Sequence, residues 1–199
     1  MKRVRFLLTA VIVLALFWAL GRPLPVAGAR IPPAGKFLSP FAGFWVSGQG
    51  LDRLPVDLAL PGLTGEVDVL WDDRRVPHIF AANDHDAWFM QGWLTARDRL
   101  WQMEFQTHVA AGRLAEIIGE GGLDLDRYHR RIGLPLAAER ALAATEEDPA
   151  SLEALTAYAA GVNAWIQSLS PADLPLEYKI LDYRPEIFKF EKFNLNNFK

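Results

Sequence analysis

The sequence ARDRLWQME, residues 96–104, lies at the centre of the stretch that decides the fold. Around it, large apolar residues such as Phe89, Trp93 and Leu100 recur at intervals of three or four positions. This spacing is typical of a helix that buries one apolar face. The sequence therefore predicts a long helix that begins near Ala87.

The residues before this helix predict a β-hairpin. Val67, Val69 and Trp71 alternate with polar residues, which is the period of a half-buried strand. A polar turn follows at residues 72–75, and a second short apolar strand is expected at residues 76–81.

The ends of the long helix, and the helices after it, also follow from residue type. Asn83 and Asp84 offer side-chain oxygens that can cap its N-terminus. Gly112 is expected to interrupt it, and Pro149 fits the first turn of a further helix. A shorter amphipathic helix is predicted at residues 136–145. The fold class is therefore α+β and helix-rich.

The composition excludes several classes of function. The chain has 199 residues, a formal net charge of −3 and no cysteine. The near-neutral charge gives no basic face for nucleic acid. The lack of cysteine excludes disulfides, thiolate metal sites and a cysteine nucleophile.

The N-terminal residues predict export from the cytoplasm. Residues 1–22 combine a basic start with an apolar run at 6–20, and small residues at 27–29 offer a cleavage site. We expect an uncleaved membrane anchor at residues 4–20, with a cleaved signal as the alternative. Either way, the rest of the chain is expected in the periplasm or another extracytoplasmic space. Residues 23–55, rich in proline and glycine, predict an extended linker.

The histidines do not form a recognisable metal site in the sequence. His85 and Asp86 resemble the doublet of HD-type metal phosphohydrolases, but His78 lies in a predicted strand and is a poor further ligand. First-turn polar residues of a helix are the simpler interpretation. His108 and His129 have no carboxylate or histidine at the i+3 or i+4 position after them, so zinc is not indicated.

Four motifs in order carry a family resemblance. They are VPHI at residues 76–79, ARDRLWQME at 96–104, GRLAE at 112–116 and YAAGVNAW at 158–165. This series resembles the α-subunit region of the penicillin acylase (penicillin amidase) family of N-terminal-nucleophile hydrolases. The resemblance runs from about Val56 to Glu186. It implies that the chain is the α-chain portion of an αββα sandwich, preceded by the N-terminal apolar helix.

The resemblance also implies how a complete enzyme would work. In the family, the nucleophile is a serine at the N-terminus of a separate β chain, and its own α-amino group acts as the base. We therefore expect no catalytic, cofactor-binding or metal residue in this chain, and no amidase activity without the β-chain portion of the same precursor. Calcium belongs to the complete family member. The resemblance leaves open whether the small amide substrate is a β-lactam or an acyl-homoserine lactone.

Eight residues within the region of the resemblance are candidates for structural or subunit-interface roles. They are His78, Gln91, Arg97, Asp98, Arg99, Trp101, Gln102 and Arg113. Residues 97–99 are expected to pack the helix with a local ion-pair network, and Arg113 is expected to pair with Glu116. Arg75 stands where the family usually has glycine, so a turn with positive φ would be strained there.

The last residues differ in composition from the rest of the chain. Lysine, asparagine and phenylalanine crowd into residues 188–199. The change at Ile187 indicates a frameshift or a truncated gene, with a genuine short tail as the alternative. The predicted organisation is an export segment at 1–22, a linker at 23–55, an α-subunit-like region at 56–187 and an atypical tail at 188–199.

Two other classes of function remain open from the sequence. One is a membrane-tethered helical binding module with an unknown partner. The other is a metal phosphohydrolase that uses His85 and Asp86.

Overall fold

The computed structural model describes residues 2–22, 24–26, 29–31, 33–47 and 57–186. The chain divides into two compact units. The first unit combines Met1–Leu54 with Leu169–Arg184, and the second combines Pro55–Ser168 with Pro185–Lys199. The atypical segment predicted at 188–199 lies outside the described residues.

The second unit begins with the predicted β-hairpin. Strand β3 (Val67–Trp71) pairs antiparallel with β4 (Pro77–Ala81), with Val69 opposite Ile79. Burial alternates along both strands, so that one face of the hairpin packs inward. The hairpin prediction is confirmed, and its period-two pattern explains why: only one face has a core to join.

Helix α3 (Asp84–Ala111) follows the hairpin and carries the long apolar pattern. Its N-cap is Asn83, whose side chain accepts a hydrogen bond from the Asp86 backbone N–H at 2.8 Å. The helix ends at Gly112, which adopts a left-handed conformation with φ of 64°. Arg99 has non-helical dihedral angles and marks a kink within the helix. The predicted cap at Asn83 is confirmed. Gly112, expected only as an interruption, ends the helix, and a separate short helix follows at Ala115–Ile118.

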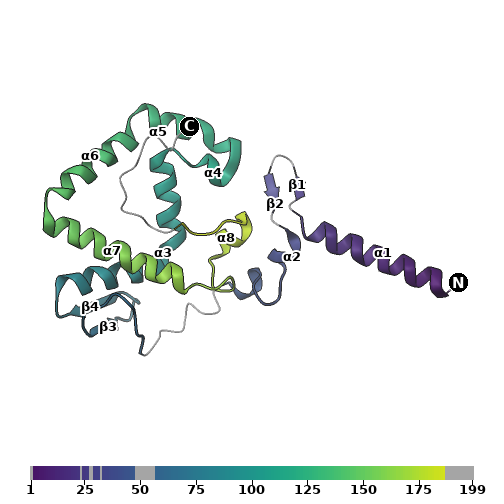
Figure 1. The fold of residues 1–199 in the computed structure, drawn as a ribbon, viewed down its shortest axis with the longest axis horizontal. Helices are drawn as coiled ribbons and strands as arrows, with labels where there is room; N and C mark the ends of the chain where they lie inside the picture. Colours follow the sequence, from purple (N-terminus) through teal and green to yellow (C-terminus); the bar gives the residue numbers. More distant parts are fainter. Residues whose placement is uncertain (1, 23, 27–28, 32, 48–56, 187–199) are drawn as a thin grey trace. The chain divides into compact units, whose positions relative to one another are not determined.

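Helix α7 (Pro149–Ser168) packs along α3, and the two helices lie side by side in Figure 1. Two glycines face the partner backbone across this contact. A Cβ atom at Gly92 would overlap the Tyr158 carbonyl oxygen, and one at Gly161 would overlap the Phe89 carbonyl oxygen. Glycine therefore lets the two backbones approach more closely than any side chain would allow.

The core of this unit forms where the hairpin meets α3 and α7. Trp93 on α3 is 5% exposed and contacts Trp165 of α7 edge-to-face, with ring centroids 5.1 Å apart. Hydrophobic residues from the hairpin and from the segment before it pack against the same cluster. They are Leu60, Leu63, Val67, Val69, Trp71 and Ile79.

Four short elements connect α3 to α7. They are α4 (Ala115–Ile118), the 3-10 helix η2 (Gly119–Gly122), α5 (Leu123–Arg131) and α6 (Leu134–Glu146). The sequence predicted α6 at slightly narrower bounds and did not predict α5. In α5 the buried residue is Asp126, whose carboxylate accepts hydrogen bonds from the backbone N–H groups of Leu114 and Ala115. The apolar residues of this short helix, Leu123, Leu125 and Tyr128, are exposed, so α5 lacks the buried apolar face by which the sequence pattern identifies a core helix.

The first unit begins with α1 (Lys2–Leu20) and includes α8 (Leu176–Leu181). Within residues 23–55, where the sequence predicted an extended linker, the described residues form short elements. They are β1 (Leu24–Val26), β2 (Ala29–Ile31), α2 (Ala34–Phe37) and the 3-10 helix η1 (Phe44–Val46). Strands β1 and β2 pair antiparallel, and the rings of Phe37 and Phe44 stack with centroids 4.9 Å apart. The prolines exclude long elements but not these short ones.

The expected membrane anchor is not supported. Among the described residues, no helix combines the length and the apolar character needed to cross a membrane.

The turn between the two strands of the hairpin is strained at one residue. Arg75 has a φ of 61°, the left-handed region that the sequence analysis identified as the problem with arginine at this position. The Asp72 side chain stabilises the turn by accepting hydrogen bonds from the backbone N–H groups of Arg74 and Val76. The turn therefore keeps its shape at a conformational cost.

We predict that Arg75→Gly raises the free energy of unfolding by about 1 kcal/mol, because glycine removes the left-handed penalty. Chemical denaturation of the wild type and the variant measures this change. The matched control is Arg74→Gly, at a neighbouring turn position without positive φ. The control is expected to lower stability by up to about 1 kcal/mol, since glycine only adds freedom to the unfolded chain. Equal changes in the free energy of unfolding for Arg75→Gly and Arg74→Gly would contradict backbone strain at Arg75.

Candidate functional site

A buried carboxylate organises the first turn of α3. Asp86 has no solvent exposure and accepts hydrogen bonds from the Thr64 backbone N–H and hydroxyl, each at 2.8 Å, and from the Gly65 N–H at 2.9 Å. The Asn83 side-chain amide donates to it at 2.9 Å, and His85 Nδ1 lies 3.2 Å away. These bonds tie the loop before the hairpin to the start of α3.

The protonation of Asp86 follows from this arrangement. Burial by itself raises the pKa of the Asp86 carboxyl, but hydrogen bonds from Thr64, Asn83 and His85 outweigh it and hold that pKa well below its usual range. The carboxylate is therefore ionised and already surrounded by protein donors. A metal ion would have to displace these donors, so the geometry argues against the HD-type phosphohydrolase alternative.

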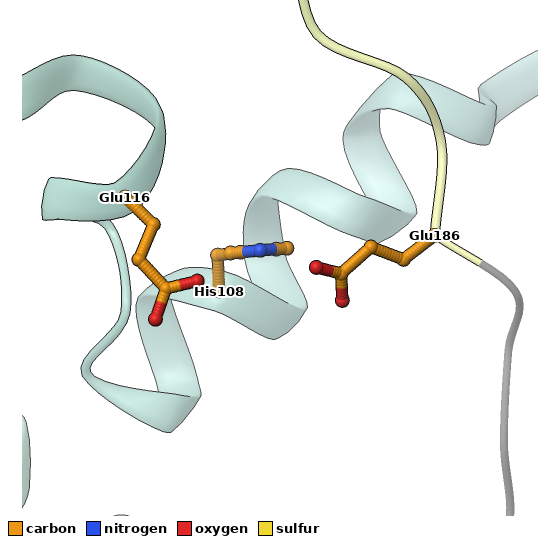
Figure 2. Close-up of side chains that lie close together, drawn as sticks. All are labelled: His108, Glu116 and Glu186. Atoms are coloured by element: carbon orange, nitrogen blue, oxygen red, sulfur yellow. The ribbon is translucent and has the colours of Figure 1, made fainter. Parts of the chain in front are cut away.

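A second polar cluster lies at the C-terminal end of α3. Figure 2 shows the His108 ring between two carboxylates, that of Glu116 from α4 and that of Glu186 from the segment after α8. The ligand-type atoms of these three side chains all lie within 4.8 Å of one another. His108 is only 2% exposed, whereas both glutamates reach the surface.

Arg113 links the two carboxylates of this cluster. Its guanidinium donates to both carboxylate oxygens of Glu116, at 3.0 and 2.7 Å, and to Glu186 at 3.3 Å. The hydrogen bond from Arg113 is the main cause that lowers the pKa of the Glu116 carboxyl, against the opposing effect of burial. The buried Glu104 carboxylate also belongs here, because it accepts the Glu186 backbone N–H at 3.2 Å.

Sequence reasoning found one pair of this cluster and missed the rest. The predicted ion pair between Arg113 and Glu116 is confirmed. The sequence did not indicate a metal site at His108, because no carboxylate or histidine follows it at i+3 or i+4. In the structure Glu116 and Glu186 reach His108 through the turn at Gly112 and the chain after α8. No local spacing signals such a contact, since it depends on tertiary structure.

The eight candidate residues lie on the hairpin, on α3 and just after α3, and the structure does not gather them into one site. His78 is exposed on β4, 3.8 Å from Asp72, and Gln91 and Gln102 are exposed on α3. The Arg97 side chain is largely buried, and its guanidinium lies 5.9 Å from the Trp71 ring and 4.0 Å from the Asp98 carboxylate. The ring of Trp101 lies 5.8 Å from that of Phe105, and Arg99 is exposed at the kink. Their interface role stays a prediction.

Comparison with known proteins places the chain in a family. A sequence model described as penicillin amidase matches residues 66–196. The chain belongs to the penicillin amidase family. The match continues past Glu186, where the motif resemblance ended, and so includes part of the segment that the composition had marked as atypical.

The relatives of this chain include penicillin acylases and acyl-homoserine lactone acylases. The chain is 38% identical over 136 residues to penicillin acylase 2 proenzyme of Pseudomonas sp. (strain SE83), which covers 68% of this chain and 17% of that protein. It is 34% identical over 150 residues to the acyl-homoserine lactone acylase QuiP of Pseudomonas aeruginosa, covering 74% of this chain and 17% of the relative. The chain thus spans 17% of the length of each of these relatives.

A solved structure agrees with the sequence relatives. A chain of the thermostable penicillin G acylase from Alcaligenes faecalis is similar with a TM-score of 0.55 and 29% identity. The similarity covers 62% of this chain and 65% of that chain. The helix-rich fold is therefore shared with a penicillin amidase family member.

We predict that Asp86→Asn lowers the melting temperature. The Asn side chain would place an NH₂ group, itself a donor, against N–H and O–H donors that bind the carboxylate in the wild type. The loss is expected to be largest above the unfolded carboxyl pKa of about 3.9 and to shrink as the pH falls below it, because a depressed native pKa stabilises only the ionised form. Thermal unfolding from pH 7 to pH 3 measures both effects.

The matched control for this substitution is Asp84→Asn, at an exposed position of the same helix turn. It is expected to change the melting temperature little. A loss for Asp86→Asn that does not vary with pH would contradict an ionised Asp86.

Proposed function

We propose that this chain supplies the α-subunit portion of an exported amidohydrolase that cleaves linear amide C–N bonds. The observation that carries the proposal is the penicillin amidase match over residues 66–196, supported by the relatives named as acylases. In the proposed reaction, a serine at the N-terminus of a β chain attacks the amide carbonyl. Its α-amino group takes the hydroxyl proton, and the amine leaves from an acyl-enzyme ester that water then hydrolyses.

The hydrogen bonding of the serines supports a nucleophile from another chain. Ser47 accepts a hydrogen bond from Lys179 Nζ, which also donates to the carbonyls of Gly43 and Ala172. Burial lowers the pKa of the Lys179 ammonium, with Asp173 opposing the shift. The three acceptors engage the Nζ–H donors of the ammonium, and that form cannot act as a base. The other serines have partners close in sequence: Ser39 with Phe41, Ser151 with Asp148, Ser168 with Trp165 and Ser170 with Asp173.

The surface of the hairpin supports a protein partner. Strands β3 and β4 form a sheet of two strands, so each has an edge that pairs with no other described strand. Leu70 and Phe80, on the outer face, are 62% and 57% exposed. A two-stranded sheet with such a face is suited to extension and cover by further strands. A β-chain portion of the same precursor fits this requirement.

The test is to sequence the DNA after codon 199 in all three frames and to express any joined product. The proposal expects a segment that opens with Ser-Asn-x-Trp, cleavage of the product into two chains, and hydrolysis of an N-phenylacetyl or N-acyl homoserine lactone amide. Cell fractionation is expected to place the product outside the cytoplasm.

Two controls make this test decisive. The 199-residue chain alone is expected to show no turnover, and replacement of the opening serine by alanine is expected to remove both cleavage and hydrolysis. Turnover by the chain alone, or a cleaved product without amide hydrolysis, would contradict the proposal. If no frame continues into such a segment, the β-chain assignment fails for this protein.

A further inference from the structure

We propose that His108, Glu116 and Glu186 form a binding site for a divalent transition metal such as Zn²⁺. The three side chains come from the end of α3, from α4 and from the segment after α8, and they converge as shown in Figure 2. One imidazole nitrogen and two carboxylate oxygens are a ligand set that zinc accepts, with water completing the coordination.

The orientation of His108 suits metal binding. Its Nδ1 lies 3.0 Å from the Glu104 backbone carbonyl oxygen. Because that oxygen can only accept, Nδ1 carries the proton, and in the neutral ring the lone pair is on Nε2. A backbone carbonyl that holds the ring N–H in this way is the usual outer contact of a metal-bound histidine. The Nε2 atom is therefore the expected ligand.

The two carboxylates already hold a positive group between them. Arg113 Nη2 lies 2.7 Å from Glu116 and 3.3 Å from Glu186. The same oxygens can bind a metal ion if the guanidinium moves aside, which its place near the surface allows. The metal thus competes with Arg113 for one position.

Only small movements bring the three ligands to bonding geometry. Ligand atoms around a tetrahedral zinc lie about 3.5 Å apart, given bonds of about 2.0–2.2 Å. The present separations are at most 4.8 Å. Glu116 and Glu186 are exposed, so their rotamers can adjust once Arg113 moves aside, whereas buried His108 is held in place.

The histidine nitrogen decides which metals fit. Calcium and magnesium prefer sites made of oxygen ligands, whereas zinc, cobalt and nickel accept imidazole. The inference is therefore separate from the calcium of complete family members. It does not depend on the proposed amidase function either, because the bound metal would link α3, α4 and residues 185–186 within this chain.

The experiment titrates Zn²⁺ into the full chain without a polyhistidine tag, by calorimetry, and repeats the titration with Co²⁺ by visible absorption. One metal per chain is expected. Glu116→Gln and Glu186→Gln are each expected to weaken binding at least about tenfold, because each removes a charged ligand. Arg113→Gln is expected to tighten binding about tenfold, because it removes the competing cation.

Glu120→Gln is the matched control, since Glu120 is an exposed carboxylate close in sequence to Glu116 but outside the cluster. The Glu120→Gln variant is expected to bind Zn²⁺ with the affinity of the wild type. The proposal is overturned if neither wild type nor Arg113→Gln saturates below about 1 mM metal. It is also overturned if Glu116→Gln or Glu186→Gln binds Zn²⁺ as tightly as the wild type does, or if Arg113→Gln binds Zn²⁺ no more tightly than the wild type.

Discussion

The close backbone contact between α3 and α7 is the constraint on which the second unit depends. Gly92 faces the Tyr158 backbone and Gly161 faces the Phe89 backbone, so each helix carries one glycine into the contact. The neighbouring residues Phe89, Trp93 and Val162 are buried by this approach. Packing of this kind stabilises through many small contacts that all require the same interhelical distance.

Other features of the unit take their positions from this helix pair. The hairpin packs against Trp93, and the Asp86 carboxylate joins the first turn of α3 to Thr64 and Gly65 ahead of the hairpin. At the opposite end of α3, Gly112 reverses the chain, so that Arg113 and the residues after it return past His108. A shift of α3 would therefore disturb both polar clusters.

The sequence predicted those elements whose residues act locally. The alternation at Val67–Trp71 gave the hairpin, Asn83 gave the helix start, and Arg75 gave a strained turn that the structure has at φ of 61°. Glu104 is buried and its carboxylate accepts the Glu186 backbone N–H, a contact far along the chain that no local pattern indicates. The sequence likewise could not predict that His108 lies beside Glu116 and Glu186, because hydrophobic periodicity reports local structure and not tertiary contacts.

The most direct test of the account is the stability of Gly161→Ala beside Ala160→Gly, an exposed position of the same helix. Helix propensity alone would make Gly161→Ala stabilising by about 1 kcal/mol. The close contact of α3 and α7 predicts the opposite for Gly161→Ala, a loss of about 3 kcal/mol in the free energy of unfolding, because the new methyl group meets the Phe89 carbonyl. Ala160→Gly is expected to cost about 1 kcal/mol. A Gly161→Ala chain as stable as the wild type, or more stable, would contradict the close contact of α3 and α7.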